Sequence, residues 1–315
     1  MVAVSPFRLH PSLGWIGEGS VGREDGLTHL SWQERFDALS VPILAVVPAA
    51  LMLILFFLVP MFVALRYSLL SSMPFFDPNP HYTIANYVRV LVEPIYRNAF
   101  IRTGGYAAVA TAISLLVSYP VAYYLSRKSR RGSLLLLVLL IPFWTSVILR
   151  VFAWKIILGS SGILNWALMS VGLIDTPIRF LYTGLGVVFG LVYTYTPYMI
   201  LPLYATLGKV PNELLEASED LGANKLQTLV RITLPLTSSG TVSGVILVML
   251  ASFGDVLSSQ LLGGANTLMI STVIFETFMG GANWATGSAL SVIVFATLLL
   301  LAAIVARLGR EREYA

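Results

Sequence analysis

Six long apolar stretches, separated by shorter polar segments, dominate the pattern of hydrophobic and polar residues along the chain. A helix needs about 20 predominantly apolar residues to cross the hydrocarbon core of a bilayer, and each stretch is long enough to do so. The pattern therefore predicts an all-α membrane protein with six transmembrane helices. Their expected bounds are residues 41–65, 103–125, 133–157, 182–207, 235–262 and 288–308.

The two ends of the chain lie outside these stretches. Residues 1–40 are polar, and the first apolar stretch begins too late and runs too long for a secretory signal peptide. We therefore expect a polar N-terminal extension over residues 1–40, a six-helix transmembrane domain over residues 41–308, and a short tail over residues 309–315.

The composition excludes several classes of protein. Only 11% of the residues are charged and 57% are apolar, whereas soluble domains carry about 25% charged residues, so a soluble or a disordered protein is excluded. The chain has no cysteine, which excludes disulfides, thiolate catalysis and cysteine-ligated metals. Its three histidines are not spaced as a metal-binding pair. We expect neither a metal nor a cofactor in this chain.

Lysine and arginine are distributed unevenly between the two sides of the predicted membrane. With six spans, both termini share a side with the loops after the second and fourth spans, and this side holds 13 of the 20 basic residues. The densest cluster is RKSRR at residues 127–131. Because cytoplasmic loops are enriched in lysine and arginine, we expect both termini in the cytoplasm. The net charge of +4 then reflects membrane topology rather than nucleic-acid binding.

The loop over residues 209–235 differs from everything around it because it is polar and has helical periodicity. Pro211 suits the first position of a helix, and Leu214, Ala217 and Leu221 recur at helical spacing as one apolar stripe. Gly222 stands where a helix would end in a left-handed conformation. The pattern predicts two short helices outside the membrane, the second over residues 223–232, with an acidic and partly apolar exposed face.

The same loop closely resembles the EAA signature of the permease subunits of ABC importers. That signature reads E-A-A, three residues, G, nine residues and I-x-L-P, and every spacing is kept here. The one departure is a serine in place of the second alanine. The matching residues are Glu216-Ala217-Ser218, Gly222, Ile232 and Leu234-Pro235.

Three later segments resemble the spermidine/putrescine group of these permeases more specifically. They are SFGD at residues 252–255, LLGG at 261–264 and NWATGSAL at 283–290. Branches of the family that transport iron(III), phosphonates or other small solutes share parts of them, so the substrate stays open.

The resemblance implies a type I ABC importer permease fold in a bacterial inner membrane. It implies a coupling helix that binds an ATPase subunit, two such subunits that hold ATP and Mg²⁺, a sister permease chain and a substrate-binding protein outside the membrane. This chain lacks the phosphate-binding loop of an ATPase. The residues expected to couple to the ATPase are Leu214, Glu216, Ala217, Ser218, Leu221 and Gly222.

Carboxylates and aromatic faces are the groups expected along a route for a flexible polycation. Asp255 is the best candidate because a carboxylate beside hydrocarbon is costly unless it is wet, paired or used. Tyr195 and Tyr198 lie three residues apart and share a helix face. Glu276, expected in a glycine-rich connection, is a weaker candidate. All four residues also suit ordinary packing or a wet vestibule, and both interpretations stay open.

Two other classes of protein remain alternatives. A secondary transporter places ionisable coupling groups inside the membrane, and Asp255 and Glu276 are the only acids near the apolar stretches. A membrane enzyme would need a nucleophile with its base or a cluster of carboxylates. No histidine lies in a predicted span, and the acids of the loop over residues 209–235 are spaced as a solvated or docking face. The residues therefore favour a transport subunit over both alternatives.

Overall fold

Helices make up nearly all of the computed structural model, which describes residues 47–48, 50–72, 79–281 and 283–311. Within these residues the only β-type pairing is one isolated bridge between Leu70 and Tyr82. The chain divides into two compact units, Met1–Pro60 and Met61–Ala315. The predicted extension over residues 1–40 lies outside the described residues, and its boundary stays a prediction.

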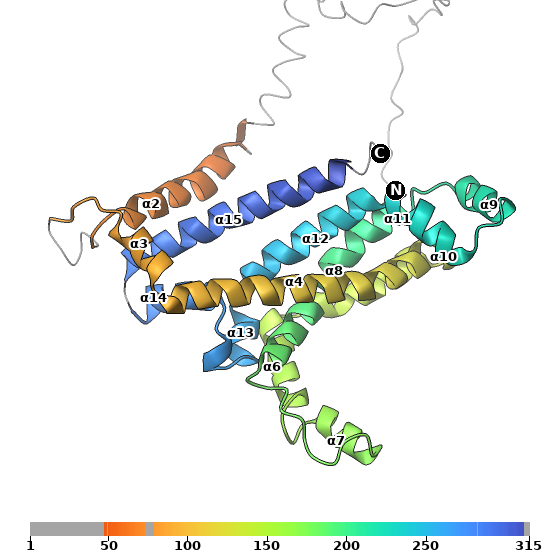
Figure 1. Cartoon of the computed structure of the whole chain (residues 1–315), viewed down its shortest axis with the longest axis horizontal. Coiled ribbons are helices and arrows are strands. Elements are labelled where there is room, and N and C mark those ends of the chain that lie inside the picture. Colours follow the sequence, from red (N-terminus) through yellow and green to blue (C-terminus); the bar gives the residue numbers. More distant parts are fainter. Residues whose placement is uncertain (1–46, 49, 73–78, 282, 312–315) are drawn as a thin grey trace, which may run out of the picture. The chain divides into compact units, whose positions relative to one another are not determined.

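Three helices form the centre of the second unit. They are α4 (Pro94–Tyr123), α8 (Gly184–Leu207) and α12 (Ser238–Phe253), and they pack against one another along much of their length (Figure 1). The long helix α15 (Trp284–Glu311) packs against α12. Small residues permit close approach of helices in a membrane, and the buried positions of α4 are all small: Ala99, Thr103, Ala107, Ala110, Thr111, Ser114, Ser118 and Ala122.

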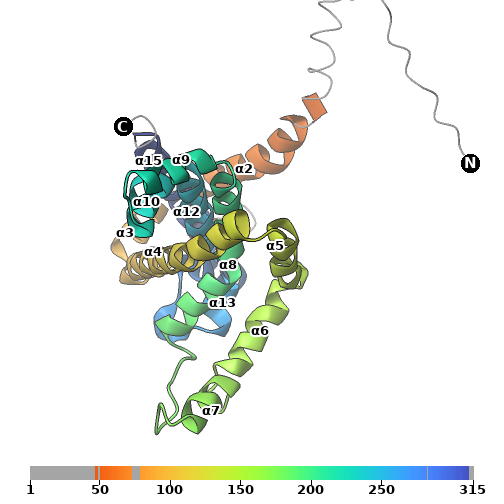
Figure 2. The same ribbon diagram turned by 90° about the vertical axis from the view of Figure 1, so that its right-hand side faces the viewer.

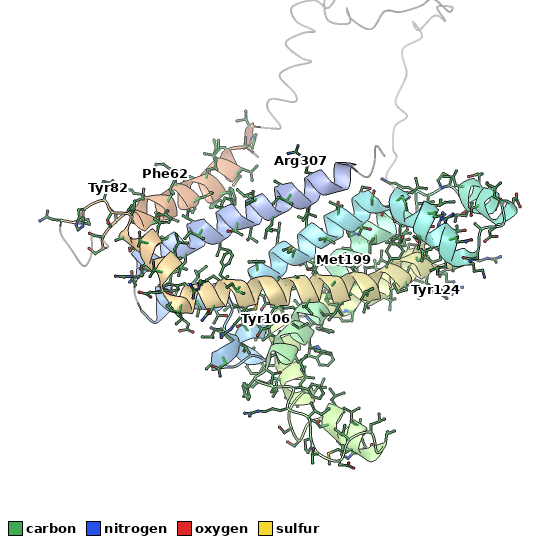
Figure 3. All side chains as sticks on the ribbon, viewed as in Figure 1. Phe62, Tyr82, Tyr106, Tyr124, Met199 and Arg307 are labelled. Atoms are coloured by element: carbon green, nitrogen blue, oxygen red, sulfur yellow. The ribbon has the colours of Figure 1, made fainter. Side chains whose placement is uncertain are left out.

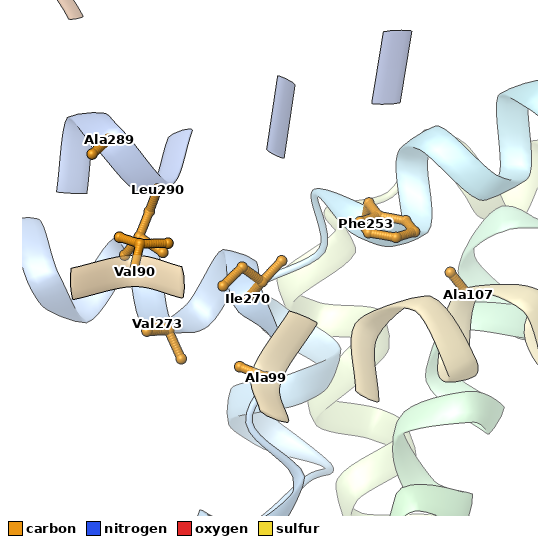
Figure 4. Packing of buried hydrophobic residues seen from close by; sticks show 8 residues of the cluster. All are labelled: Val90, Ala99, Ala107, Phe253, Ile270, Val273, Ala289 and Leu290. Atoms are coloured by element: carbon orange, nitrogen blue, oxygen red, sulfur yellow. The ribbon is translucent and has the colours of Figure 1, made fainter. Parts of the chain in front are cut away.

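Larger side chains fill the spaces on either side of this close contact. One cluster joins α4, α12, α14 (Ile270–Met279) and α15 through residues such as Phe253, Ile270 and Leu290 (Figure 4). A second cluster surrounds Met199 of α8, which lies inside the bundle, whereas Phe62 of α2 (Val59–Ser68) is 69% exposed (Figure 3). The buried face of α4 thus has small residues, whereas α8 contributes large aliphatic residues to the core.

The predicted spans correspond to helices, but two of them are broken. Four helices are long and apolar enough to cross a membrane: Ala50–Ser68, Pro94–Lys128, Gly184–Leu207 and Trp284–Arg307. Two further pairs, Gly132–Trp144 with Val147–Ile157 and Lys225–Leu236 with Ser238–Phe253, bend by 85° and 70°. The count of six spans holds if each bent pair is one span.

Several predicted span boundaries differ from those of the helices. The second span begins at Pro94 rather than at residue 103. The prediction began too late because arginines in the first turns of this helix lower the local hydropathy. The fifth span ends at Phe253 rather than at residue 262, and the short helix α13 (Leu257–Leu261) follows it. The start of the first span at residue 41 lies outside the described residues.

The third span bends where its sequence contains Pro142. The helix α5 (Gly132–Leu140) passes through a 3-10 turn, η3 (Ile141–Trp144), into α6 (Val147–Ile157). Proline removes a backbone donor from the helix ladder, which explains a break here. The helices α6 and α7 (Ile163–Ser170) extend away from the central bundle in both views (Figures 1 and 2).

Short helices gather at the end of the bundle where α4 begins. They are α3 (Ala85–Val92) and α14 (Ile270–Met279) (Figure 1). The backbone N–H of Ile270 donates to the hydroxyl of Thr103 at 2.7 Å, which joins α14 to α4. Glu276 lies in the glycine-rich connection after the fifth span, as predicted, and this connection contains the helix α14.

Candidate coupling and transport sites

A helical hairpin over residues 209–236 lies at the opposite end of the bundle from α3 and α14 (Figure 1). Its first helix is α9 (Asn212–Asp220), and Gly222 follows with φ of +82°. The second helix is continuous through α10 (Lys225–Thr228), a π turn (Leu229–Thr233) and α11 (Leu234–Leu236). The predicted helix–turn–helix and the left-handed glycine are both present.

The ends of the two short helices differ slightly from the prediction. Pro211 precedes α9 as its cap residue instead of occupying its first turn. The second helix begins at Lys225 rather than at residue 223, because Asn224 caps it. The Asn224 side chain accepts from the N–H of Gln227, whose side chain accepts from the N–H of Asn224, both at 2.9 Å. This capping box holds the turn after Gly222 in place.

Ser218 joins the two helices of the hairpin from the inside. It is 4% exposed, its hydroxyl donates to the carbonyl of Leu215 at 2.7 Å, and it shares a hydrogen bond with the Thr228 hydroxyl at 2.8 Å. The serine that departs from the E-A-A pattern therefore gives the hairpin an internal hydrogen bond. Any effect of Ser218 on a bound partner is indirect.

The outer surface of the hairpin is apolar and acidic. Leu214 is 43% exposed and Leu221, at the tip, is 89% exposed, while Ala217 and Glu216 are also exposed. No described residue forms an ion pair with Glu216. An exposed leucine beside an unpaired carboxylate is a surface suited to protein binding. The predicted stripe of Leu214, Ala217 and Leu221 is thus available on one face.

A cavity of about 540 Å³ lies between this hairpin and the last turns of α4. Its lining combines tyrosines from α4 with charged groups from both elements, including Tyr123, Lys128 and Glu216. Glu216 therefore faces the mouth of a mixed-charge cavity as well as solvent. An arginine from a partner would have access to its carboxylate there.

Two contacts fasten the hairpin to α4. Arg127, in the π turn Tyr124–Lys128 that ends α4, donates to the carbonyl of Val210 at 2.6 Å and to the side-chain oxygen of Asn212 at 3.0 Å. At the other end of the hairpin, the hydroxyls of Tyr119 and Thr237 share a hydrogen bond at 3.0 Å. From the sequence alone, Arg127 is only a marker of topology, and no local pattern indicates these contacts.

The second candidate site is centred on Asp255, in the turn after α12. One carboxylate oxygen accepts from the N–H of Ser258 at 2.6 Å, and the other accepts from the Ser258 hydroxyl at 3.1 Å and from the Tyr195 hydroxyl at 2.9 Å. Asp255 is only 5% exposed. The buried carboxylate is thus satisfied by hydrogen bonds from protein groups.

The two predicted tyrosines lie beside this carboxylate. Tyr195 packs against Tyr198 with 6.0 Å between ring centroids, and Tyr198 is 49% exposed. Arg150 of α6 lies over the ring of Phe143 at 4.9 Å, and two of its guanidinium nitrogens are buried without a hydrogen-bond partner. The structure therefore brings Asp255, Tyr195 and Tyr198 together. The position of the Arg150 guanidinium over Phe143 has no local signal in the sequence.

Glu276 does not join this cluster directly. It is exposed on α14 and accepts a hydrogen bond from the Gln260 side chain at 3.3 Å. A backbone link nevertheless connects its helix to Asp255, because the Ser271 hydroxyl of α14 donates to the Asp255 carbonyl at 2.5 Å. Among the described residues, no group of three or more histidine, cysteine or acidic side chains is arranged to hold a metal ion.

Apolar helices of membrane-spanning length, a buried carboxylate beside α8 and an exposed hairpin at one end are the features of a multi-pass membrane protein with an extramembrane contact surface. Comparison with known families agrees: the binding-protein-dependent transport system inner membrane component family matches residues 111–312. The chain belongs to this family, whose members are permease subunits of ABC importers. It is an inner-membrane, multi-pass protein.

Curated relatives cover most of the chain. It is 41% identical over 224 residues to the spermidine/putrescine transport system permease protein PotB of Escherichia coli, covering 70% of this chain and 81% of that protein. It is 39% identical over 254 residues to PotB of Haemophilus influenzae, covering 79% and 87%. The trehalose/maltose permease MalF of Thermococcus litoralis is 26% identical over 280 residues, covering 86% and 94%.

Solved structures show the same fold. A chain of a bacterial ABC transporter that imports the acidic polysaccharide alginate superimposes with a TM-score of 0.65 at 17% identity, covering 89% of this chain and 98% of that one. A second structure holds the bacterial alginate transporter in complex with a periplasmic protein bound to an alginate pentasaccharide. Its chain superimposes with a TM-score of 0.66 at 16% identity, covering 90% and 98%. The predicted fold class is confirmed.

Proposed function

We propose that this chain is one of two membrane-spanning subunits of an ATP-driven importer for polyamines such as spermidine and putrescine. The observation that carries the proposal is the 41% identity to a spermidine/putrescine permease over 224 residues. A sister permease chain completes the route, two ATPase subunits bind ATP and Mg²⁺, and a binding protein outside the membrane delivers the substrate.

The hairpin over residues 209–236 is, in this proposal, the element that contacts the ATPase. Its exposed leucine tip and unpaired Glu216 support this role, because a charge-assisted bond from an ATPase arginine would satisfy the carboxylate. Gly222 sets the angle between the two helices. Glu216, Leu214, Ala217 and Leu221 form the contact, while Ser218 holds it together from within.

Asp255, with Tyr195 and Tyr198, is proposed to line the substrate route. A buried carboxylate that binds a tyrosine hydroxyl gives the route a negative charge behind an aromatic surface. Ammonium groups are attracted both to carboxylates and to aromatic faces. Glu276, exposed on α14, would add charge at the entrance.

Uptake by the reconstituted complex tests the proposed substrate. With the ATPase, the sister chain and the binding protein in liposomes, we expect ATP-dependent accumulation of spermidine or putrescine in preference to an amino acid, ferric iron or a phosphonate. Preferential uptake of one of the last three would replace the substrate assignment. Ion-driven uptake by this chain alone, without ATP, would instead support a secondary transporter.

Thiol labelling tests the proposed orientation, with both termini and the hairpin in the cytoplasm. The chain has no cysteine, so single cysteines introduced at Ser129 and at Ser161 report their own positions. Because the basic cluster at residues 127–131 favours the cytoplasm, an impermeant reagent added outside intact cells should label position 161 and spare position 129. Labelling of position 129 alone would invert the topology.

A further inference from the structure

Arg127 lies at the junction between the longest membrane-spanning helix and the hairpin. It belongs to the π turn Tyr124–Lys128, which continues α4 beyond its last regular turn. Its two terminal guanidinium nitrogens donate to acceptors in the segment that leads into α9, at 2.6 Å to the Val210 carbonyl and 3.0 Å to the Asn212 side chain. Both acceptors are more than 80 residues from Arg127 along the chain.

These two acceptors flank Pro211, the cap residue of α9, so the guanidinium holds the backbone on both sides of the point where that helix begins. Val210 is 5% exposed and Pro211 has a restricted backbone, which leaves little freedom between the two bonded positions. A guanidinium presents its donors in a rigid planar fork, whereas an ammonium is a compact point charge on a flexible stem. Only arginine is well shaped to hold both acceptors at once.

The neighbouring basic residues are placed differently. Arg130 and Arg131 are exposed in the same cluster, and neither guanidinium has a described hydrogen bond to the hairpin. If the cluster acted only through its positive charge, Arg127 would be equivalent to them. The bonds to Val210 and Asn212 set it apart.

A second contact makes α4 the support for both ends of the hairpin. The Tyr119–Thr237 hydrogen bond at 3.0 Å holds the segment that leaves the hairpin for α12. Tyr119 and Arg127 are eight residues apart, a separation of about 12 Å along a helix. The hairpin is therefore fastened to one helix at its entry and at its exit.

We propose that Arg127 is a positioning residue that makes α4 move together with the hairpin when the ATPase subunits close. The inference rests on the proposed coupling role of the hairpin. It adds that the mechanical link into the membrane runs through the guanidinium of Arg127 to α4. At its far end α4 holds α14 through Thr103 and Ile270, so movement of α4 reaches the turn that contains Asp255.

Transport per ATP hydrolysed is the quantity that tests the link. In reconstituted complexes, Arg127→Gln should assemble with the ATPase and hydrolyse ATP, but transport per ATP should fall about tenfold, as expected for loss of charge-assisted hydrogen bonds. Arg127→Lys keeps the charge, and its transport per ATP should fall nearly as far as that of Arg127→Gln. Arg130→Gln, which removes the same charge from an exposed position, should behave as the unaltered protein.

Lysine at position 127 distinguishes the link from a simple charge effect. If Arg127→Lys couples normally while Arg127→Gln does not, Arg127 acts through charge and the proposal is overturned. Normal coupling by both variants overturns it equally. If a variant fails to assemble with the ATPase, a measurement on the permease alone decides whether Arg127 positions α9.

Spin labels provide that measurement without relying on transport. Cysteines introduced at Tyr124, which is 57% exposed, and at the exposed Glu213 report the distance between the end of α4 and α9. The distance distribution should be narrow with Arg127 and broad with Arg127→Gln or Arg127→Lys. An unchanged distribution would show that Arg127 does not position α9, whether or not the hairpin contacts the ATPase. Conversely, a broadened distribution with normal transport per ATP would show that Arg127 positions α9 but is not the link that couples α4 to the ATPase, and the proposed contact between the hairpin and the ATPase would still stand.

Discussion

Replacing Gly222 with valine should uncouple the importer, with transport falling by at least about tenfold while membrane insertion stays normal. Gly222 has φ of +82°, and a left-handed backbone costs an L-residue about 1–2 kcal/mol, more when the side chain is β-branched. A side chain at this position would meet no neighbouring atom, so the penalty comes from the backbone alone. The turn between α9 and α10 would lose its left-handed conformation, and Leu221 would be displaced.

Two controls isolate this effect. Gly222→Asn should retain most transport, because asparagine tolerates the left-handed region. The second control, Gly172→Val, carries the same kind of backbone strain, since Gly172 has φ of +75° and an added Cβ would meet no atom within 4 Å. Gly172 lies in the loop after α7 and not in the hairpin, so this variant should transport normally. Normal coupling by Gly222→Val in a correctly inserted complex would refute the assigned role of the hairpin turn.

Glu216→Ala tests the binding of the hairpin to the ATPase without changing the conformation of the hairpin. The exposed carboxylate has no ion-pair partner within the described residues, so its removal should leave α9 intact. We expect weaker association with the ATPase and less stimulation of ATP hydrolysis. Glu213→Ala, an exposed change in the first turn of the same helix, serves as the matched control.

Asp255→Asn should lower uptake of a polyamine by about tenfold while the complex assembles normally. The substitution keeps the shape but removes the charge that accepts hydrogen bonds from Ser258 and Tyr195. Hydrogen bonds to charged groups contribute about 1.5–3 kcal/mol, and the attraction for an ammonium group is lost with them. Uptake measured across a substrate titration gives both KM and maximal rate.

Glu276→Gln provides the comparison for Asp255. It removes the same charge from an exposed carboxylate that accepts only one described hydrogen bond, from Gln260, and should have a smaller effect. Equal uptake by Asp255→Asn and the unaltered protein would refute a cationic route at this site. The proposed substrate would then shift toward an anionic or neutral solute.

Local signals in the sequence predicted the hairpin well. Helical spacing of Leu214 and Leu221 and a glycine at the correct position require no knowledge of distant contacts, and α9 and the left-handed turn follow from them. The exact start of the second helix differed because the reciprocal bonds of Asn224 and Gln227 compete with extension of the helix.

Features that depend on tertiary contacts were predicted less well. Hydropathy over a window detects length and apolarity, so it cannot reveal that the third span breaks near Pro142. The sequence singled out Asp255, Tyr195 and Tyr198 as candidates for one route, and the three lie together. The burial of Asp255 and its hydrogen bond to Tyr195 arise only when α8 and the turn after α12 pack together. The contact between Arg127 and the hairpin was not predicted, because membrane topology already explains why a cluster of basic residues stands at this place.

The buried face of α4 has a consequence for how this helix is able to move. Every fully buried residue of its 30-residue length is alanine, serine or threonine, so the line of closest contact has shallow relief, and larger side chains such as Phe100 and Leu115 pack beside it. Helices that interlock through leucine or phenylalanine must change rotamers before they slide, whereas a shallow surface permits shear without repacking. This line of small residues thus allows α4 to slide along its axis as well as to pack closely. A single leucine in place of Ala107 or Ala110 would obstruct that sliding.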